Sequence, residues 1–270
     1  MCCRLINWLL AATILLLPTH VAFASEKILP QPDHIVVVIF ENHSFNQIMD
    51  STDAPFFQKL ARGGALFINS FAVTHPSQPN YFALFTGSTQ GVHDDDDHRL
   101  NAPTLADALA AARKRFIGYI ETGSPRKHNP WESFTNLRAT EQNLSEFPSD
   151  FAQLPTVSFV ISNLDHDMHD GSIRDGDVWL RRHLGSFAEW SKTHNSLLIV
   201  TFDEDNNAAG NRILTIFYGA CVRPGSYAVH ITHYSVLSTL LAINALPRFA
   251  EAATTPPIRA IWDKQSMCHS

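Results

Sequence analysis

Side chains with carboxylate and amide oxygens cluster directly after two long apolar runs, HIVVVIF at 34–40 and SLLIVTF at 196–202. These side chains are Glu41 and Asn42 after the first run, and Asp203, Glu204 and Asp205 after the second. Such oxygens bind hard divalent cations, and crowded carboxylates repel one another unless a cation or protons neutralise them. We therefore expect a divalent-metal site, in which at most two of the three successive acids share one ion. Each cluster alone also fits a simpler structure, a helix cap at ENHSF or a solvated acidic turn at DED.

A serine precedes an apolar, helix-like segment in the stretch HPSQPNYFALFTG (75–87). If Pro79 lies in the first helical turn, Ser77 stands at the helix N-terminus, where N–H groups and the helix dipole favour a phosphate-like anion. A serine hydroxyl is a weak nucleophile and needs a base or a metal to stabilise its alkoxide. Asn80 would lie near the same helix end and could donate its amide to a developing oxyanion. The alternative for this stretch alone is that Ser77 is only an N-cap.

Histidines and aspartates alternate in the segment NLDHDMHDG (163–171). Asp165 and His169 stand four residues apart, so one helical turn could aim both side chains at one point. His233 follows much later, in HITHY. The pattern favours a functional cluster, although some of these histidines could lie on the surface.

Four consecutive aspartates occupy positions 94–97. They lack the spaced ligands and the glycine of a calcium-binding loop. We expect a solvated loop here.

Apolar runs alternate with amphipathic segments along the chain, which predicts an α/β protein with a largely parallel central sheet, a three-layer sandwich. We expect strands at 34–40, 65–73, 116–121, 156–162, 196–202 and 213–219, and helices at 104–116, 175–194 and 234–246. Segment 121–137 is predicted to be a long functional loop. Ligands of open α/β sheets bind beyond the carboxyl ends of the strands. The acids, amides and imidazoles named above follow such ends, so we expect them to meet at one edge of the sheet.

The N-terminus, MCCRLINWLLAATILLLPTHVAFASEK, is typical of a secretory signal peptide. It predicts cleavage after residues 1–24 and a single mature domain at 25–270, located in the periplasm or secreted, with no stable membrane insertion. The alternative is an uncleaved anchor, for which the apolar run is short. Cys221 and Cys268 would remain in the mature chain, where a disulfide between them is plausible in an exported protein.

Composition excludes one class of partner. The 270 residues carry a formal net charge of −6, and no long basic tract interrupts them. Nucleic-acid binding therefore has no electrostatic basis here.

Six ordered blocks carry a resemblance to a known family: HIVVVIFENHSF, HPSQPNYFALFTG, KHNPWESF, FDEDN, GACVRPGSY and THYSVLSTL. They span residues 34 to about 247 and resemble the bacterial phosphoesterase family, which contains secreted acid phosphatases and phosphatidylcholine-type phospholipases C. That family belongs with the alkaline phosphatase superfamily, so the resemblance implies an alkaline-phosphatase-like fold. SQPNYFALFTG also looks like the nucleophile block of the nucleotide pyrophosphatase/phosphodiesterases.

The resemblance implies a role for each matching residue. Ser77 would be the covalent nucleophile, and Asn80 would hold a phosphoryl oxygen. The implied metal ligands are Glu41, Asn42, Asp203 and Glu204, with Ser77 completing the shell. Two-metal relatives place a histidine where Glu204 stands, so one divalent ion of unknown identity is favoured here. Asp165, His169 and His233 match the spacing of a second metal site in two-metal relatives, so a second ion remains an alternative there. The other alternative is that these histidines contact phosphate directly, as in the acid phosphatases.

The sequence thus predicts a metal-dependent phosphoric ester hydrolase that acts on a small phosphorylated substrate, most simply an acid phosphatase forming a phosphoserine intermediate. His166 or His169 could protonate the leaving oxygen. His128, in the KHNPW block, is expected to contact substrate, together with His233 and Asp165. Two alternatives remain: a phospholipase C-like phosphodiesterase, and a catalytically inactive secreted protein that binds metal or phosphate.

Overall fold

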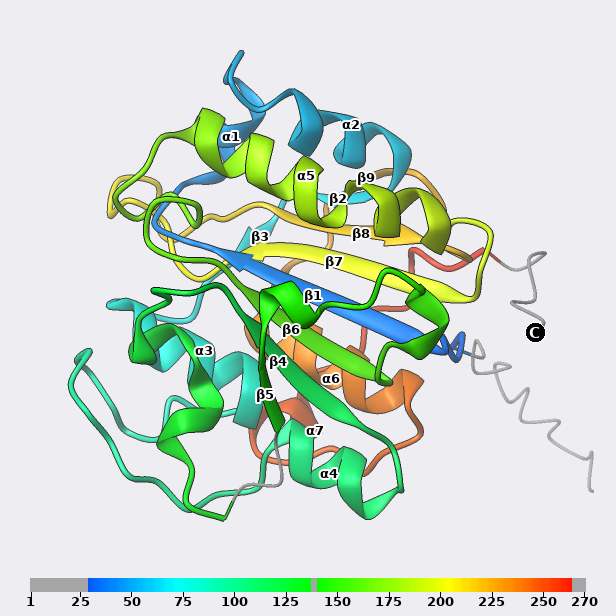
Figure 1. Ribbon diagram of the computed structural model, residues 1–270. Helices are drawn as coiled ribbons and strands as arrows, with labels where there is room; N and C mark the ends of the chain where they lie inside the picture. Colours follow the sequence, from blue (N-terminus) through cyan, green and yellow to red (C-terminus); the bar gives the residue numbers. More distant parts are fainter. Residues whose placement is uncertain (1–28, 137–139, 264–270) are drawn as a thin grey trace, which may run out of the picture.

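An eight-stranded sheet forms the centre of the molecule in the computed structural model, which describes residues 29–136 and 140–263 (Figure 1). Its strand order is β5-β4-β6-β1-β7-β8-β2-β9, and a small second sheet pairs β10 with β3. The strands are β1 (His34–Phe40), β2 (Ala65–Phe67), β3 (Ser70–Phe71), β4 (Phe116–Ile120), β5 (Thr140–Asn143), β6 (Val157–Ile161), β7 (Ser196–Phe202), β8 (Thr215–Gly219), β9 (Gly225–Tyr227) and β10 (Ile231–Thr232).

The central strands β6, β1 and β7 run in parallel and are apolar on both faces, which is why their sequences show no alternation. Their register sets the geometry of the sheet edge. Phe40 of β1 lies opposite Phe202 of β7, so Glu41 and Asp203 leave the sheet side by side. The N–H of Asp203 donates to the carbonyl of Phe40 at 2.9 Å, which extends the ladder to the point where the acids begin.

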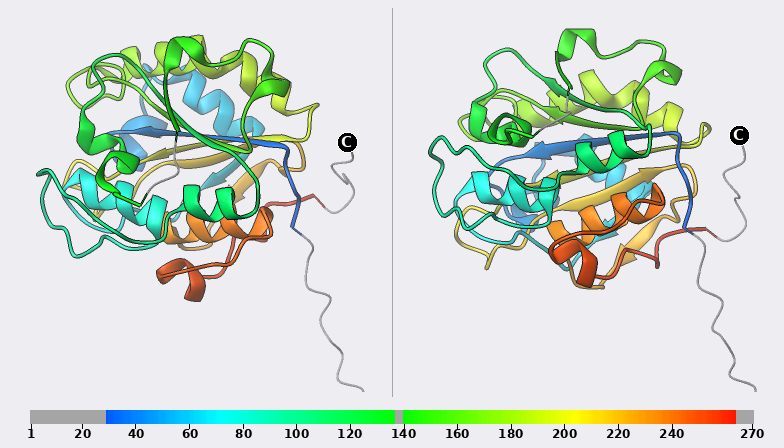
Figure 2. Two further views of the ribbon diagram at one scale, coloured as in Figure 1. Left: turned by 60° about the horizontal axis from the view of Figure 1, so that its bottom comes forward. Right: turned by 90° about the horizontal axis from the view of Figure 1, so that it is seen from below.

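Helices cover both faces of the sheet and complete a three-layer sandwich, which confirms the predicted fold class (Figure 1). One layer contains α1 (Phe45–Met49), α2 (Pro55–Gly63) and α5 (Ile173–Ser191). The other contains α3 (Ser77–Thr86), α4 (Leu105–Ala111), α6 (His233–Ile243) and α7 (Glu251–Thr254), and it comes forward when the molecule is turned (Figure 2). Each layer encloses its own cluster of fully buried apolar side chains against the sheet.

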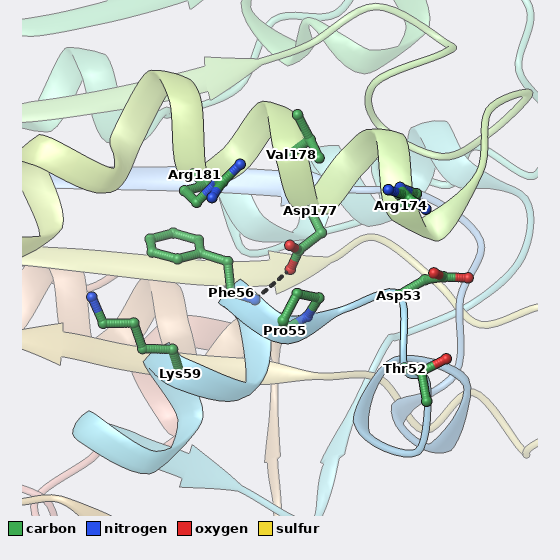
Figure 3. A pocket seen from close by; sticks show the side chains of 9 residues that line it. All are labelled: Thr52, Asp53, Pro55, Phe56, Lys59, Arg174, Asp177, Val178 and Arg181. Atoms are coloured by element: carbon green, nitrogen blue, oxygen red, sulfur yellow. Dashed lines mark hydrogen bonds between the residues drawn. The ribbon is translucent and has the colours of Figure 1, made fainter.

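The first layer is joined by a buried acid of α5. Asp177 accepts hydrogen bonds from the backbone N–H groups of Phe56, at 2.7 Å, and Phe57, at 3.0 Å, at the start of α2 (Figure 3). These N–H groups have no partner inside α2, since the first turn of a helix leaves its donors unpaired. A pocket of ≈ 450 Å³ lies beside this contact, between α2 and α5.

Most of the predicted elements are confirmed, with small shifts at their ends. α5 begins at Ile173 because Ser172 and Asp175 form a capping box. α4 ends at Ala111, earlier than the predicted 116. One expectation needs correction: segment 65–73 is divided between β2 and β3. β8 pairs antiparallel with β7, within a sheet that is otherwise largely parallel, as predicted. The 121–137 loop contains two short 3-10 turns, η1 (Arg126–His128) and η2 (Pro130–Ser133).

Several predictions concern the ends of the chain. The signal peptide at 1–24 lies outside the described residues, and so does Cys268. Cys221 is disulfide-bonded. In the part of the chain that the structure describes, no helix has the length and apolar character needed to cross a membrane.

Candidate active site

Two acids meet at the edge of the sheet where β1 and β7 end. Glu41 and Asp203 are buried, with 0% and 1% of their surfaces exposed. Asn42, the second residue after β1, donates its N–H to Asp203 Oδ1 at 3.1 Å. Asn42 has a φ of 51°, a left-handed conformation that asparagine tolerates better than most residues. The chain therefore turns sharply after β1 and keeps Asn42 against the acids.

Ser77 is the first residue of α3, and its side chain lies within this group of acids. Its hydroxyl donates to Glu41 Oε2 at 2.9 Å and lies 3.4 Å from Glu204 Oε1. The helix N-cap is Pro76, so the hydroxyl of Ser77 is not used as a cap. The expected meeting of the serine with acids from two distant loops is thus present in the structure.

Glu204 is the third acid of the group and is 5% exposed. Burial, and then the charge of Asp203, raise its pKa to about 8. The same two kinds of cause act on Glu41, whose pKa is raised well above its ordinary value by burial and by the charges of Asp203 and Asp167. Without a neutralising partner, these carboxylates resist ionisation together.

A buried histidine extends the group. His128 lies between two carboxylates, with Nε2 at 3.3 Å from Glu41 Oε1 and Nδ1 at 3.1 Å from Asp167 Oδ2. Tyr81 stacks on its ring and donates a hydrogen bond to Glu41 Oε1. Burial lowers the pKa of His128 to about 3 and raises that of Asp167 to about 7. Glu41, His128 and Asp167 offer three ligand atoms within 4.8 Å of one another and could hold a metal ion.

Unsatisfied buried atoms support this assignment. Within the described residues, Asp203 Oδ2 and His128 Nε2 are buried without a hydrogen-bond partner. Leaving such atoms unpaired is costly in a protein interior. Several buried carboxylates with raised pKa values, together with an unprotonated imidazole, form the donor set that a divalent cation would neutralise.

The structure corrects the choice among the aspartates of segment 163–171. Asp165 is exposed, whereas Asp167 is fully buried and carries the contact with His128. The carbonyl of Asp167 also accepts the N–H of Glu41 at 2.8 Å, so the segment is fastened to the end of β1. The predicted helical turn that would align Asp165 with His169 is absent from this described segment, which instead folds as a series of turns. Sequence spacing alone could not distinguish two aspartates separated by one residue.

The remaining predicted histidines lie in three different surroundings. His233 is buried at the start of α6, where Nε2 lies 2.7 Å from the carbonyl oxygen of Asp203, and burial lowers its pKa to about 4. His166 contacts Glu121 at 2.9 Å and is partly exposed. His169 contacts Asp170 at 2.7 Å, and its ring centre lies 6.1 Å from that of His128.

Asn80 is buried one turn after Ser77, and its amide is engaged by the preceding loop. Its Oδ1 accepts the N–H groups of Val73, at 2.9 Å, and Thr74, at 3.1 Å. Its Nδ2 donates to the carbonyls of Thr74, at 2.8 Å, and Pro76, at 3.1 Å. Asn80 therefore holds the loop that leads into Ser77, and its contact with a phosphoryl oxygen stays a prediction.

Comparison with known proteins supports the same chemistry. The model of the Phosphoesterase family matches residues 48–247. A phosphatidylinositol-3-phosphatase of Mycobacterium tuberculosis is 47% identical over 252 residues, covering 87% of this chain and 84% of that protein. An acid phosphatase of Aspergillus fumigatus is 30% identical over 224 residues, covering 70% of this chain and 50% of that protein.

The fold also has relatives among solved structures. A protein of the alkaline phosphatase superfamily from Vibrio parahaemolyticus superposes with a TM-score of 0.61 at 15% identity. The superposition covers 86% of this chain and 72% of that chain. The expected alkaline-phosphatase-like fold is therefore confirmed.

Proposed function

Because the chain belongs to the Phosphoesterase family and is thus a phosphoric ester hydrolase, we propose that it is a phosphatase that cleaves phosphomonoesters through a phosphoserine at Ser77. The observation that carries this proposal is the position of the Ser77 hydroxyl, 2.9 Å from Glu41 Oε2 and 3.4 Å from Glu204 Oε1 at the sheet edge. The Ser77 hydroxyl does not cap the helix, so the start of α3 does not depend on it. It fits a nucleophile whose alkoxide is formed beside a cation site.

One divalent ion would be held by Glu41, Asn42, Asp203 and Glu204. A second ion could bind at Glu41, His128 and Asp167. Such an ion would supply positive charge that favours the serine alkoxide and neutralises the phosphoryl oxygens. The unpartnered Asp203 Oδ2 and the raised pKa values of these acids support the assignment.

The chain's own residues account for the covalent steps. Ser77 Oγ would pass its proton to Glu41, the carboxylate that accepts its hydrogen bond, and attack phosphorus. The bond from phosphorus to the ester oxygen breaks, and that oxygen leaves with a proton. His166 or His169 could supply this proton, since both imidazoles are reachable from solvent. Water then attacks the phosphoserine, which releases phosphate and restores the serine hydroxyl.

Asn80 is proposed to act by position. Its four hydrogen bonds to residues 73–76 fix the entry into α3, so the Ser77 hydroxyl is presented in one orientation. His233 would likewise position Asp203, because it contacts the carbonyl oxygen of that residue. His128 remains a candidate for contact with substrate.

The relatives favour a monoester as substrate. Both curated relatives reported above have phosphatase names, and phosphatases hydrolyse phosphomonoesters. A phospholipase C-like diesterase remains the alternative, and comparison of p-nitrophenyl phosphate with bis(p-nitrophenyl) phosphate distinguishes the two. The N-terminal pattern supports a periplasmic or secreted location.

Replacement of the nucleophile tests the proposal. We expect Ser77→Ala to reduce hydrolysis of p-nitrophenyl phosphate on the order of 1000-fold or more, because the covalent step is lost. Acid quenching during turnover, followed by mass spectrometry, should find phosphate on a peptide that contains Ser77.

The matched control is Ser191→Ala in α5, a buried serine that donates to the carbonyl of Ala188. Ser191 precedes the start of β7, whereas the acids follow the other end of that strand. Retention of most activity by Ser77→Ala would remove this serine from the nucleophile role. A protein that binds phosphate and turns over neither ester would instead be a binding protein.

A further inference from the structure

The run of four aspartates at 94–97 lies against the start of α3, and Asp95 is the one of the four that is half-buried. Asp95 Oδ1 accepts the N–H of Gln78 at 2.9 Å. The side chain of Gln78 donates to the carbonyl of Asp96 at 2.7 Å, and Arg126 of η1 donates to the same carbonyl at 2.8 Å. The loop therefore joins the residue that follows the nucleophile to the KHNPW segment.

This loop places one cation beside the acids. Lys127 Nζ lies 2.8 Å from Asp95 Oδ2, with 23% of its side chain exposed. Its neighbour His128 lies 3.3 Å from Glu41 Oε1, and Ser77 contacts the other oxygen of the same carboxylate. The other oxygen of Asp95 accepts the N–H of Gln78, the residue after Ser77, so one carboxylate holds the Lys127 ammonium beside the start of α3.

The ammonium of Lys127 has donors beyond its contact with Asp95. An ammonium has three N–H donors, and the contact with Asp95 uses one of them. Arg126, the neighbouring cation, already donates to Asp97, Ser133 and Gln78.

The edge of the sheet needs such a cation if its substrate is a dianion. The acids there would offset much of the charge of a bound divalent ion, and a phosphomonoester carries one more negative charge than a diester. A charge-assisted hydrogen bond from an ammonium offsets that extra charge. A diester has an ester group in place of this oxygen and gains less from the ammonium.

We propose that Lys127, anchored by Asp95, binds a non-bridging oxygen of the phosphoryl group and selects phosphomonoesters over phosphodiesters. This inference rests on the proposed function, because it assigns a specificity to the same site. Asp95 positions the ammonium, and Lys127 contacts the substrate.

Substitution at Lys127 tests the proposal through a ratio of two activities. We expect Lys127→Met to lower kcat/KM for p-nitrophenyl phosphate by about tenfold or more, and for bis(p-nitrophenyl) phosphate by about threefold at most. Lys127→Arg keeps the charge and should restore most of the preference. The matched control, Lys59→Met, removes a lysine that pairs with Glu189 at 2.6 Å between α2 and α5, and should leave both activities unchanged.

Binding of orthophosphate gives a second readout that does not depend on turnover. In the Ser77→Ala protein, titration calorimetry should show about tenfold weaker phosphate binding when Lys127→Met is added. Equal losses for both esters, together with unchanged phosphate binding, would overturn the proposal. If the unaltered protein hydrolyses neither ester, the proposed function fails, and the calorimetric comparison alone decides the role of Lys127.

Discussion

Two regions of the molecule bury carboxylates, and they differ in the hydrogen bonds that these carboxylates receive. Between α2 and α5, Asp177 is 3% exposed and accepts two backbone N–H groups (Figure 3). At the sheet edge, Glu41 and Asp203 are as deeply buried, but one oxygen of Asp203 has no partner among the described residues. The first acid completes a helix, whereas the second group accumulates charge that only protons or a cation can neutralise.

The same contrast separates neighbours in one short segment. Asp205 follows Glu204 directly and is fully buried, yet it accepts the N–H groups of Asn207, Ala209 and Asn211 at 2.7 to 2.9 Å. It organises the loop after β7. Burial of an acid is therefore a poor sign of function, and a buried carboxylate oxygen without a hydrogen-bond partner, such as Asp203 Oδ2, is a better one.

The largest expected effect concerns activity. Asp203→Asn should lower kcat/KM for p-nitrophenyl phosphate on the order of 100- to 1000-fold, because a ligand and a charge leave the site. Asp177→Asn, the same substitution at the other buried acid, should leave activity within about twofold. Metal content measured by mass spectrometry should fall only in the first variant.

Equal activity losses in the two variants would contradict the proposed difference between the two acids, since both would then affect activity by stabilising the fold. Unchanged metal content in Asp203→Asn would contradict its assignment as a ligand.

Stability should respond with opposite signs in the metal-free protein. Asp177→Ala should lower the free energy of unfolding by about 1–3 kcal/mol, because two N–H groups of α2 lose their acceptor. Asp203→Asn should leave that free energy unchanged or raise it, because a like charge leaves a crowded group. Urea unfolding with a chelator present measures both, and Asp177→Asn, which keeps an acceptor oxygen, is the control for packing. A clear loss of stability in Asp203→Asn would show that its carboxylate is needed by the fold itself.

The pH dependence of stability sharpens the same contrast. Burial raises the pKa of Asp167 to about 7. Burial, and then the charges of neighbouring acids, raise the pKa of Glu204 to about 8. Both values lie above the unfolded values of about 4. The folded state therefore binds more protons than the unfolded state, and stability falls as pH rises toward 8. The lowered pKa values of His128 and His233 act in the opposite direction only below about 6.5.

Metal-free protein should thus lose about 1–2 kcal/mol of unfolding free energy between about pH 6.5 and 8. Added divalent metal should reduce this loss, since a cation favours the ionised acids. A flat or rising profile for the metal-free protein would contradict the crowding of acids at the sheet edge.

Much of this site follows from local sequence. Two apolar runs, each followed by acids, predicted the strands β1 and β7. Parallel pairing brings the ends of such strands together at one edge of the sheet. Pro79 placed Ser77 at the start of a helix, and the structure begins α3 at that residue. The antiparallel β8 was not foreseen, because an apolar run carries no information on strand direction.

Other residues could be found only in three dimensions. Asp167 instead of Asp165 enters the site because the 163–171 segment is bonded through its backbone to Glu41. Asp94, Asp96 and Asp97 are exposed, as predicted for this loop, whereas Asp95 is half-buried and bonds both Gln78 and Lys127. Such choices depend on contacts between segments tens of residues apart.

The sequence by itself determined the layered α/β architecture, the serine and the acids, because hydrophobic period and residue chemistry are local properties. The tertiary structure decided which acids receive backbone donors and which remain crowded, and where Lys127 lies, because hydrogen-bond satisfaction is a property of the folded neighbourhood.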